Sequence, residues 1–407
     1  MTRLSTLALA ICLALATLAA QPTARSPILL LVSLDGFRWD YLDRGVSPNL
    51  SALARRGVRA KGLIPSFPSL TYPNHYTIVT GLYPEHHGII ANDFVDPDWP
   101  EPFRMSGSSS RDSRWWGGEP LWVTVLRQGK HASALFWPGD ESAIAGRRPD
   151  DWIPYDGKLS NGDRVKRVLE WLARPESSRP SFIPLYFSET DTAGHDYGPD
   201  SAEINEAIRH VDAAIGQLEA GLRDLRLLDR TTIVVVSDHG MQALSDDKVV
   251  FLDDFVDLSR IDVPEWGEVV QIRPRMNDDE EIHSELTVWG EAMMVYRRAE
   301  MGPFHYRDNP RIAPLVALAR PGWEITSHEH WASDRARGRK RGGAHGYDPD
   351  YQAMHGVFVA AGPRVKRGVR APSFQNVHVY DFLCALLGVP PAPNDGDPAV
   401  TRPFFSQ

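Results

Sequence analysis

Acidic and imidazole side chains recur at short spacings along the chain, mostly directly after apolar runs. Asp191 and His195 lie four residues apart, a spacing that places both side chains on one face of a helical turn. Considered singly, such residues are most often helix caps, turn residues or solvated side chains. Together they offer oxygen and nitrogen ligands that suit a pair of Zn²⁺ ions. The set consists of Asp35, Asp191, His195, Asp238, His239 and His345.

A hydroxyl group that could act as a nucleophile lies in the segment around Thr71. Pro73 can open a helix that runs to about Thr80 and ends at Gly81, which places Thr71 just before the helix N-terminus. The positive end of the helix dipole favours an alkoxide and an anionic phosphoryl group there, and a metal ion would lower the hydroxyl pKa further. A plain helix cap is the alternative, and spacing alone favours it.

Four apolar runs predict the strands that must position these groups. They cover residues 27–34, 181–188, 231–237 and 356–361. Continuous apolar runs are typical of strands that are buried on both faces of a mostly parallel sheet. Asp35, Asp191 and Asp238 fall at the carboxyl ends of three of the runs, which is where the chemistry of such sheets gathers.

Helical patterns alternate with these strands. Ser47 and Pro48 resemble an N-cap followed by proline at the first helical position, opening a helix over residues 49–56. Apolar residues at helical spacing predict further helices over 163–172 and 202–225. The alternation predicts an α/β fold with a doubly wound, mostly parallel central sheet and helices on both faces.

Composition bounds the class of protein. The 407 residues are 42% hydrophobic and 24% charged, which is typical of a globular chain and excludes disordered, collagen-like and coiled-coil proteins. A formal net charge of −9 argues against a nucleic-acid scaffold that works by bulk charge. No composition break marks a second domain. We therefore expect a single catalytic domain over residues 21–407, with loop insertions near 96–118 and 331–343.

The N-terminus predicts export. Residues 1–20 combine a basic start, a short apolar stretch and small residues at its end, which is the pattern of a secretory signal peptide. The apolar stretch is too short for a transmembrane helix, and no later run is long enough to span a bilayer. Cys12 would leave with the signal peptide, and Cys384, in an apolar helical pattern, is predicted to be a buried core thiol.

Seven ordered motifs carry a resemblance to a known family. They are residues 32–38 (VSLDGFR), 65–76 (PSFPSLTYPNHY), 81–92 (GLYPEHHGIIAN), 115–122 (WWGGEPLW), 191–195 (DTAGH), 237–241 (SDHGM) and 345–348 (HGYD). The chain resembles the nucleotide pyrophosphatase/phosphodiesterases of the alkaline phosphatase superfamily. It stops after the catalytic domain and lacks extracellular cysteines, so it looks like a minimal bacterial, periplasmic member of the family.

The resemblance implies roles for the site residues. It implies one zinc ion held by Asp191, His195 and His345, and a second held by Asp35, Asp238, His239 and Thr71. Thr71 would attack phosphorus and form a covalent nucleotidyl-threonine. Asn92 would donate a hydrogen bond to a phosphoryl oxygen.

The substrate class rests on two aromatic residues. Tyr72 follows the candidate nucleophile, and Tyr155 lies in a second aromatic segment. In the family, similar rings hold the base of a nucleotide by stacking, which tolerates any base. The expected substrates are nucleoside triphosphates, dinucleotides and esters of nucleoside monophosphates. Both tyrosines could instead be ordinary core or rim residues.

Two other functions remain open at this point. The chain could be a phosphomonoesterase or a lipid-headgroup phosphodiesterase of the same superfamily, in which only the pocket would differ. No arginine lies directly beside Thr71, which argues against an exclusive monoesterase. It could also be a metal-stabilised protein that captures phosphorylated ligands without hydrolysing them, although every ligand and the nucleophile are present.

Overall fold

The structure is a computed structural model that describes residues 26–406. The predicted signal peptide over residues 1–20, with Cys12, lies outside the described residues. No helix in the described range is both long and apolar enough to cross a bilayer.

A six-stranded sheet forms the centre of the molecule, with strand order β17-β2-β16-β7-β1-β6. Its strands are β1 (Ile28–Leu34), β2 (Val58–Ala60), β6 (Phe182–Phe187), β7 (Thr231–Val236), β16 (Phe358–Ala361) and β17 (Val369–Ala371). Strand β1 pairs in parallel with β6 on one side and β7 on the other, so that Leu30 lies opposite both Ile183 and Ile233. The three longest predicted strands are therefore confirmed, and they are neighbours.

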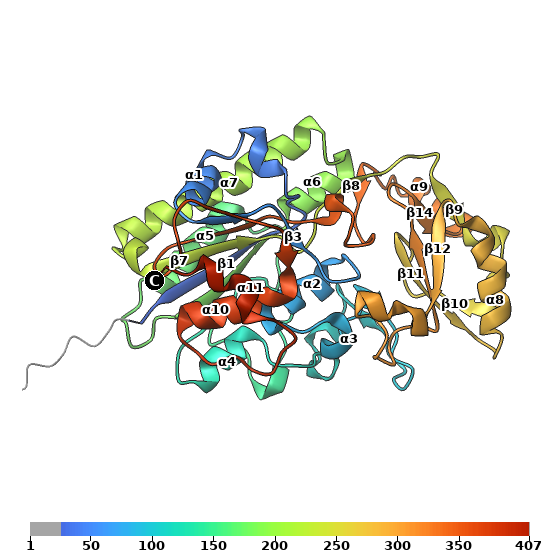
Figure 1. Cartoon of the computed structure of the whole chain (residues 1–407), viewed down its shortest axis with the longest axis horizontal. Coiled ribbons are helices and arrows are strands. Elements are labelled where there is room, and N and C mark those ends of the chain that lie inside the picture. Colours follow the sequence, from blue (N-terminus) through green and yellow to red (C-terminus); the bar gives the residue numbers. More distant parts are fainter. Residues whose placement is uncertain (1–25, 407) are drawn as a thin grey trace, which may run out of the picture.

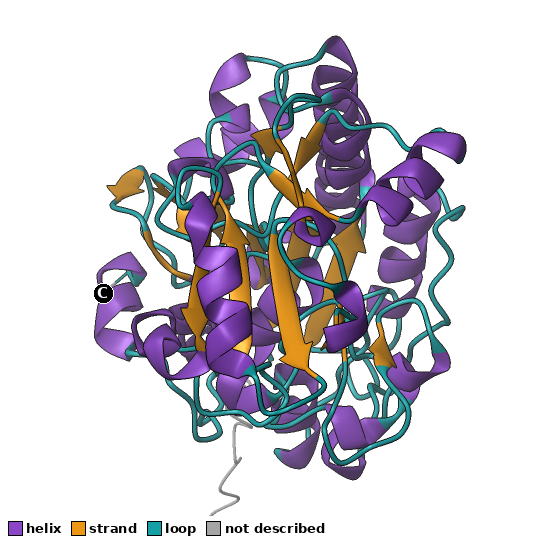
Figure 2. Cartoon of the chain, turned by 90° about the vertical axis from the view of Figure 1, so that its right-hand side faces the viewer, coloured by secondary structure: helices purple, strands orange, loops and turns teal. Residues whose placement is uncertain are grey.

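Helices cover both faces of this sheet, as Figures 1 and 2 show. One face carries α1 (Pro48–Arg55), α5 (Asn161–Leu172) and α7 (Ala202–Asp224), and the other carries α2 (Thr71–Thr80), α4 (Leu121–Arg127) and α10 (Val379–Leu387). Alternate residues of β1 enter different cores: Leu29 and Leu31 face the second group of helices, and Leu30 and Val32 face the first. The doubly wound α/β prediction is confirmed.

The three predicted helices are present as α1, α5 and α7, but the side chain of Ser47, the predicted N-cap of α1, makes no capping hydrogen bond. The Ser160 side chain accepts a hydrogen bond from the Asp163 backbone at the start of α5. The Ser201 side chain caps α7 in the same way, on the amide of Ile204. Cys384 is buried in α10, as predicted.

Strand β16 runs in the opposite direction to its neighbours. It is antiparallel to both β7 and β2, while the other five strands run parallel to one another, so the sheet is mostly parallel, as predicted. The chain reaches β16 from residues 343–355, which already lie at the carboxyl edge of β1 and β7, and no crossover helix intervenes. The start of β16, next to His355 and Gly356, therefore lies at that edge.

A second, smaller sheet was not foreseen from the sequence. Its strands β10 (Ile261–Asp262), β11 (Val269–Pro274), β12 (Met293–Arg297) and β13 (Leu315–Ala319) are antiparallel, in the order β10-β11-β13-β12. Together with α8 (Asp279–Leu286) they form the right-hand end of the molecule in Figure 1 and have a hydrophobic core of their own.

Short elements complete the described chain. The region near 331–343 was predicted to be a loop, but its first part belongs to a helix, α9 (His328–Ala336). The region near 96–118 holds one short strand, β5 (Phe103–Arg104), and two 3-10 helices. The remaining helices and strands are α3 (Pro84–His87), α6 (Glu189–Tyr197), α11 (Pro398–Thr401), β3 (Leu63–Ile64), β4 (Asp93–Phe94), β8 (Gln242–Ala243), β9 (Val249–Phe251), β14 (Glu324–Thr326), β15 (Gly343–Ala344) and β18 (Phe374–Gln375).

Candidate active site

The carboxyl edge of the central sheet gathers the predicted acidic residues. Asp35 follows β1 directly, Asp238 follows β7 by one residue, and Asp191 lies in the first turn of α6 after β6. Asp35 and Asp238 are each 1% exposed. Because these three strands are parallel neighbours, their ends bring residues from distant parts of the chain to one place.

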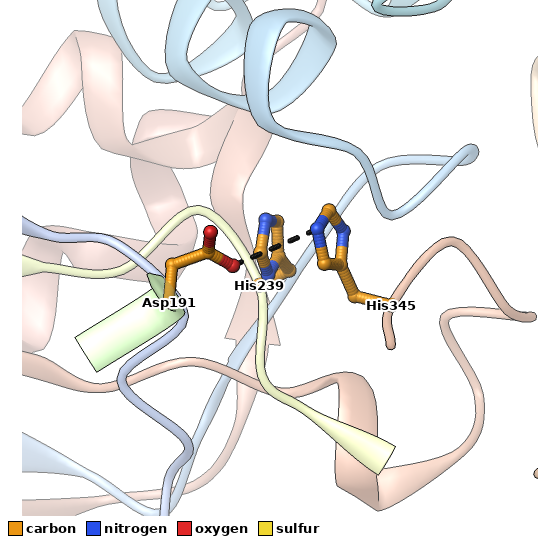
Figure 3. A group of neighbouring side chains, drawn as sticks. All are labelled: Asp191, His239 and His345. Carbon is orange, nitrogen blue, oxygen red and sulfur yellow. Dashed lines mark ion pairs between the residues drawn. The ribbon is translucent and has the colours of Figure 1, made fainter. Parts of the chain in front are cut away.

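Three histidines complete the cluster. His195 Nε2 lies 3.3 Å from Asp191 Oδ1, one turn away on α6. His345 Nε2 lies 3.7 Å from the same oxygen, the contact drawn in Figure 3. The His239 ring stacks on the His345 ring with a centroid distance of 3.5 Å, and its Nε2 lies 3.5 Å from Asp35 Oδ1.

The grouping of ligand atoms differs in part from the one that the resemblance implies. Among the described residues, two sets of three have ligand atoms within 4.8 Å of one another. The first is Asp191, His239 and His345, and the second is Asp35, His75 and Asp238. His239 stands between the two sets because it touches Asp35 on one side and His345 on the other.

The donor set fits divalent metal ions. Within residues 26–406, Asp35 Oδ1, Asp191 Oδ1 and Asp238 Oδ2 are buried carboxylate oxygens without a hydrogen-bond partner, which is costly unless a cation faces them. Each of the three histidines uses Nδ1 to bond a backbone carbonyl: His195 to Gly343, His239 to Gly240 and His345 to Ser69. This leaves each Nε2 facing the acidic cluster, the usual arrangement of histidine metal ligands.

Ionisation in this cluster is strongly perturbed. Burial, reinforced by the charges of Asp238 and Asp191, raises the pKa of Asp35 well above its usual value. Burial also opposes charge on Asp238, but the His239 imidazole outweighs it and holds the pKa of Asp238 well below its usual value. Burial lowers the pKa of His345 to about 3, so its imidazole is neutral at pH 7. Such divergent pKa values in one cavity are typical of functional sites.

Thr71 faces this cluster from the start of α2. It is the first residue of the helix, whereas the sequence placed it just before the helix, and its side chain makes no capping hydrogen bond. The helix-cap alternative is therefore wrong. Thr71 Oγ1 instead lies 3.2 Å from His239 Nε2. Asn92 lies beside it, and its Oδ1 accepts a hydrogen bond from the Tyr72 backbone, so the side chain has its NH₂ group to offer a ligand.

A cavity of about 240 Å³ adjoins the hydroxyl of Thr71. Aromatic and acidic side chains dominate its wall, and no lysine or arginine of the described chain lines it. The sequence likewise places no arginine directly beside Thr71. The lining includes Tyr72, Phe136, Trp137, Asp140, Glu141, Tyr155 and Tyr186, together with Asp35 and Asp191 of the acidic cluster.

Three residues of the site were missed by the sequence analysis. The Tyr186 hydroxyl donates a hydrogen bond of 2.5 Å to Asp35 Oδ2. His75, on α2, contacts the Thr71 carbonyl, Asp238 and Ser33. Tyr186 and Ser33 lie inside apolar runs that were interpreted only as strands. His75 lies four residues after Thr71, and that helical spacing is the one signal that could have identified it.

Comparison with solved structures identifies the class of fold. The structure of murine ectonucleotide pyrophosphatase/phosphodiesterase 5 in complex with AMP superposes with a TM-score of 0.88 at 32% sequence identity, over 94% of this chain and 100% of that one. The human protein of the same name gives the same TM-score and identity. The fold is therefore alkaline phosphatase-like, as the resemblance implied.

The sequence comparisons then give the family. The profile described as "Type I phosphodiesterase / nucleotide pyrophosphatase" matches residues 29–348. An uncharacterized pyrophosphatase/phosphodiesterase of Schizosaccharomyces pombe is 38% identical, covering 90% of this chain and 78% of that protein. A bis(5′-adenosyl)-triphosphatase of Xenopus laevis is 35% identical, over 94% of this chain and 82% of that protein. The chain belongs to this family of hydrolases.

The match to some relatives covers only part of their length. Human ectonucleotide pyrophosphatase/phosphodiesterase family member 1 is 36% identical over 91% of this chain, but the alignment spans 41% of the human protein.

Proposed function

We propose that the chain is a two-zinc hydrolase that cleaves phosphodiester and pyrophosphate bonds of nucleotides and releases nucleoside 5′-monophosphates. The observation that carries this proposal is the Thr71 hydroxyl, which lies between an aromatic cavity and a cluster of buried carboxylate and imidazole groups in which three carboxylate oxygens have no hydrogen-bond partner. The names of two relatives support it, since one is a bis(5′-adenosyl)-triphosphatase and the other is in complex with AMP.

Thr71 is the proposed nucleophile. Its Oγ1 would form a bond to phosphorus while the bond to the leaving oxygen breaks, giving a nucleotidyl-threonine, and water would then cleave that ester and restore the hydroxyl. Bound zinc ions would lower the pKa of the hydroxyl and offset negative charge on the attacking and leaving oxygens. The position of Thr71 at the first residue of α2 adds the positive end of the helix dipole.

The remaining residues would orient the substrate. Asn92 Nδ2 would donate to a non-bridging phosphoryl oxygen, where charge develops. Tyr72 and Tyr155 both line the cavity and would stack on the base, at roughly 1–3 kcal/mol per base. The expected ligands are Asp191, His195 and His345 for one zinc ion, and Asp35, Asp238, His239 and Thr71 for the other. His239 lies against both groups.

Location and source are part of the proposal. The signal-like residues 1–20 support export, to the periplasm of a bacterium.

The test compares two chromogenic substrates on zinc-loaded protein. We expect the nitrophenyl ester of thymidine monophosphate to be hydrolysed far faster than nitrophenyl phosphate, with activity lost on chelation. Thr71→Ala should abolish turnover, whereas Thr80→Ala, at the far end of the same helix, should keep it. Full diesterase activity in the Thr71→Ala protein would contradict the proposed nucleophile.

The lining of the cavity also favours a second candidate. Aromatic rings next to Asp140 and Glu141 are suited to a quaternary ammonium group, as in the choline headgroup of a lipid. Hydrolysis of glycerophosphocholine without hydrolysis of dinucleoside polyphosphates would establish this function instead. Activity on the dinucleotides alone would exclude it.

A further inference from the structure

We infer that His75 is a positioning residue for the nucleophile and not a third ligand of the second metal group. The inference rests on the proposed function, since it concerns how Thr71 is held. His75 lies on α2, one helical turn after Thr71, and is fully buried. By distance alone it would pass for a ligand, because it groups with Asp35 and Asp238.

The hydrogen bonds of the imidazole exclude His75 as a metal ligand. His75 Nδ1 lies 2.9 Å from the carbonyl oxygen of Thr71, and a carbonyl can only accept, so this nitrogen carries a proton. The same nitrogen lies 3.3 Å from Asp238 Oδ2. A metal ion needs a deprotonated nitrogen, so the one nitrogen that faces the acidic group is not available to it.

The other end of the ring is also fixed. His75 Nε2 lies 2.8 Å from the hydroxyl of Ser33, which precedes Asp35 by two residues at the end of β1. The rings of Trp137 and Tyr186 form T-shaped contacts with the imidazole at centroid distances of 5.0 and 5.2 Å. The ring therefore links the first turn of α2 to the strand end that carries Asp35.

This linkage acts on the reacting atom through the backbone. The residue whose carbonyl His75 holds is the residue whose Oγ1 lies 3.2 Å from His239 Nε2. A displacement of about 1 Å at a reacting group can lower a rate by about a hundredfold. Loss of His75 should therefore lower kcat and leave both KM and the zinc content unchanged.

Two variants of His75 test whether the hydrogen-bond donor at the Nδ1 position is what matters. His75→Asn places an amide N–H near the position of Nδ1 and keeps a donor for the Thr71 carbonyl, whereas His75→Leu removes it. We expect His75→Leu to lower kcat by about 10- to 100-fold with KM within twofold of wild type, and His75→Asn to recover most of the loss. Zinc bound per chain at saturating zinc, from elemental analysis, should remain that of wild type in both variants.

His87→Leu is the matched control. His87 is equally buried and pairs with a hydroxyl, that of Thr77, but it contacts none of the site residues. We expect it to lower Tm without changing kcat. If His75→Leu does not fold, Ser33→Ala serves as the test variant in its place, because it removes the hydroxyl that His75 Nε2 contacts. It should lower kcat by several-fold with zinc retained.

Two results would overturn the inference. Loss of one zinc ion per chain in His75→Leu would make His75 a ligand. A kcat within threefold of wild type in His75→Leu, or in Ser33→Ala where it stands in, would remove the positioning role. Failure of the proposed function is distinguishable from both, because wild-type protein would then show no diesterase activity while the zinc content still reports whether His75 is a ligand.

Discussion

Replacing Tyr186 by phenylalanine should weaken metal binding without disturbing the packing. The hydroxyl of Tyr186 donates a hydrogen bond of 2.5 Å to Asp35 Oδ2, and both side chains are buried. Burial and the Asp35 charge raise the pKa of Tyr186 well above its usual value, so the hydroxyl keeps its proton and remains a donor. Phenylalanine fills the same space, and only the hydrogen bond is lost.

The size of the effect follows from the charge that Asp35 carries when it binds a metal ion. A hydrogen bond to a charged group is worth about 1.5–3 kcal/mol, which corresponds to roughly a 10- to 150-fold change in an equilibrium constant. Asp35 Oδ1 is the oxygen free to bind an ion, and Oδ2 is the oxygen that Tyr186 holds. We therefore expect the zinc affinity of Tyr186→Phe to fall by about 10- to 100-fold, the range usual for partners of metal ligands.

The assay measures diesterase activity against free zinc set by a chelator buffer. The activation midpoint of Tyr186→Phe should move to higher zinc, and saturating zinc should restore most of the wild-type rate. Tyr41→Phe is the matched control, because the Tyr41 hydroxyl is buried and has no partner within residues 26–406. A midpoint of Tyr186→Phe within twofold of wild type would refute the reasoning, as would a rate that excess zinc does not restore.

Four further outcomes are expected. Burial raises the pKa of Glu265 to about 8 from 4.5. The folded chain therefore holds a proton that the unfolded chain releases, and the free energy of unfolding falls as the pH rises from 4.5 to 8. In urea unfolding at pH 8, Glu265→Gln should have a free energy of unfolding roughly 1 kcal/mol or more above that of wild type, and the difference should vanish at pH 4.5. Gly57→Ala places a methyl carbon 2.0 Å from a carbonyl oxygen of β16 and should cost roughly 3 kcal/mol or prevent folding, whereas Gly290→Ala, in open space, should stay within about 0.5 kcal/mol. Cys384 is buried with its pKa raised to about 12, so in a Cys12→Ser protein we expect no thiol reaction before unfolding. Metal-free protein should bind AMP at least tenfold more weakly than zinc-loaded protein in calorimetry.

Much of the central fold can be predicted from the sequence because its signals are local. The apolar runs that became β1, β6 and β7 are buried on both faces, and their polar ends mark the site. The reversal of β16 could not be predicted in this way, because the direction of a strand depends on where the preceding segment lies in space. The small sheet escaped detection because β10 is only two residues long, and β11 and β12 are partly exposed and mix polar with apolar residues.

Some residues of the candidate site could likewise be predicted from local sequence signals, and others could not. Asp35, Asp191 and Asp238 could be found because a carboxylate that ends an apolar run is conspicuous. Tyr186 could not, because a tyrosine inside a buried strand has the pattern of a core residue. Its role depends on the hydroxyl meeting Asp35, a residue 151 positions earlier in the chain.

The charges around Thr71 imply an order of binding. Burial opposes charge on Asp191 and Asp238, but neighbouring histidines outweigh it and hold the pKa of both carboxyls low; both lie in the cluster that the hydroxyl faces, and Glu141 lines the cavity. A phosphate placed about 4 Å from one such carboxylate would be repelled by roughly 4 kcal/mol at an effective dielectric constant of 20. No arginine or lysine of the described chain lines the cavity to offset this. Cations bound at these carboxylates would remove this repulsion, so we expect metal binding to precede and strengthen substrate binding.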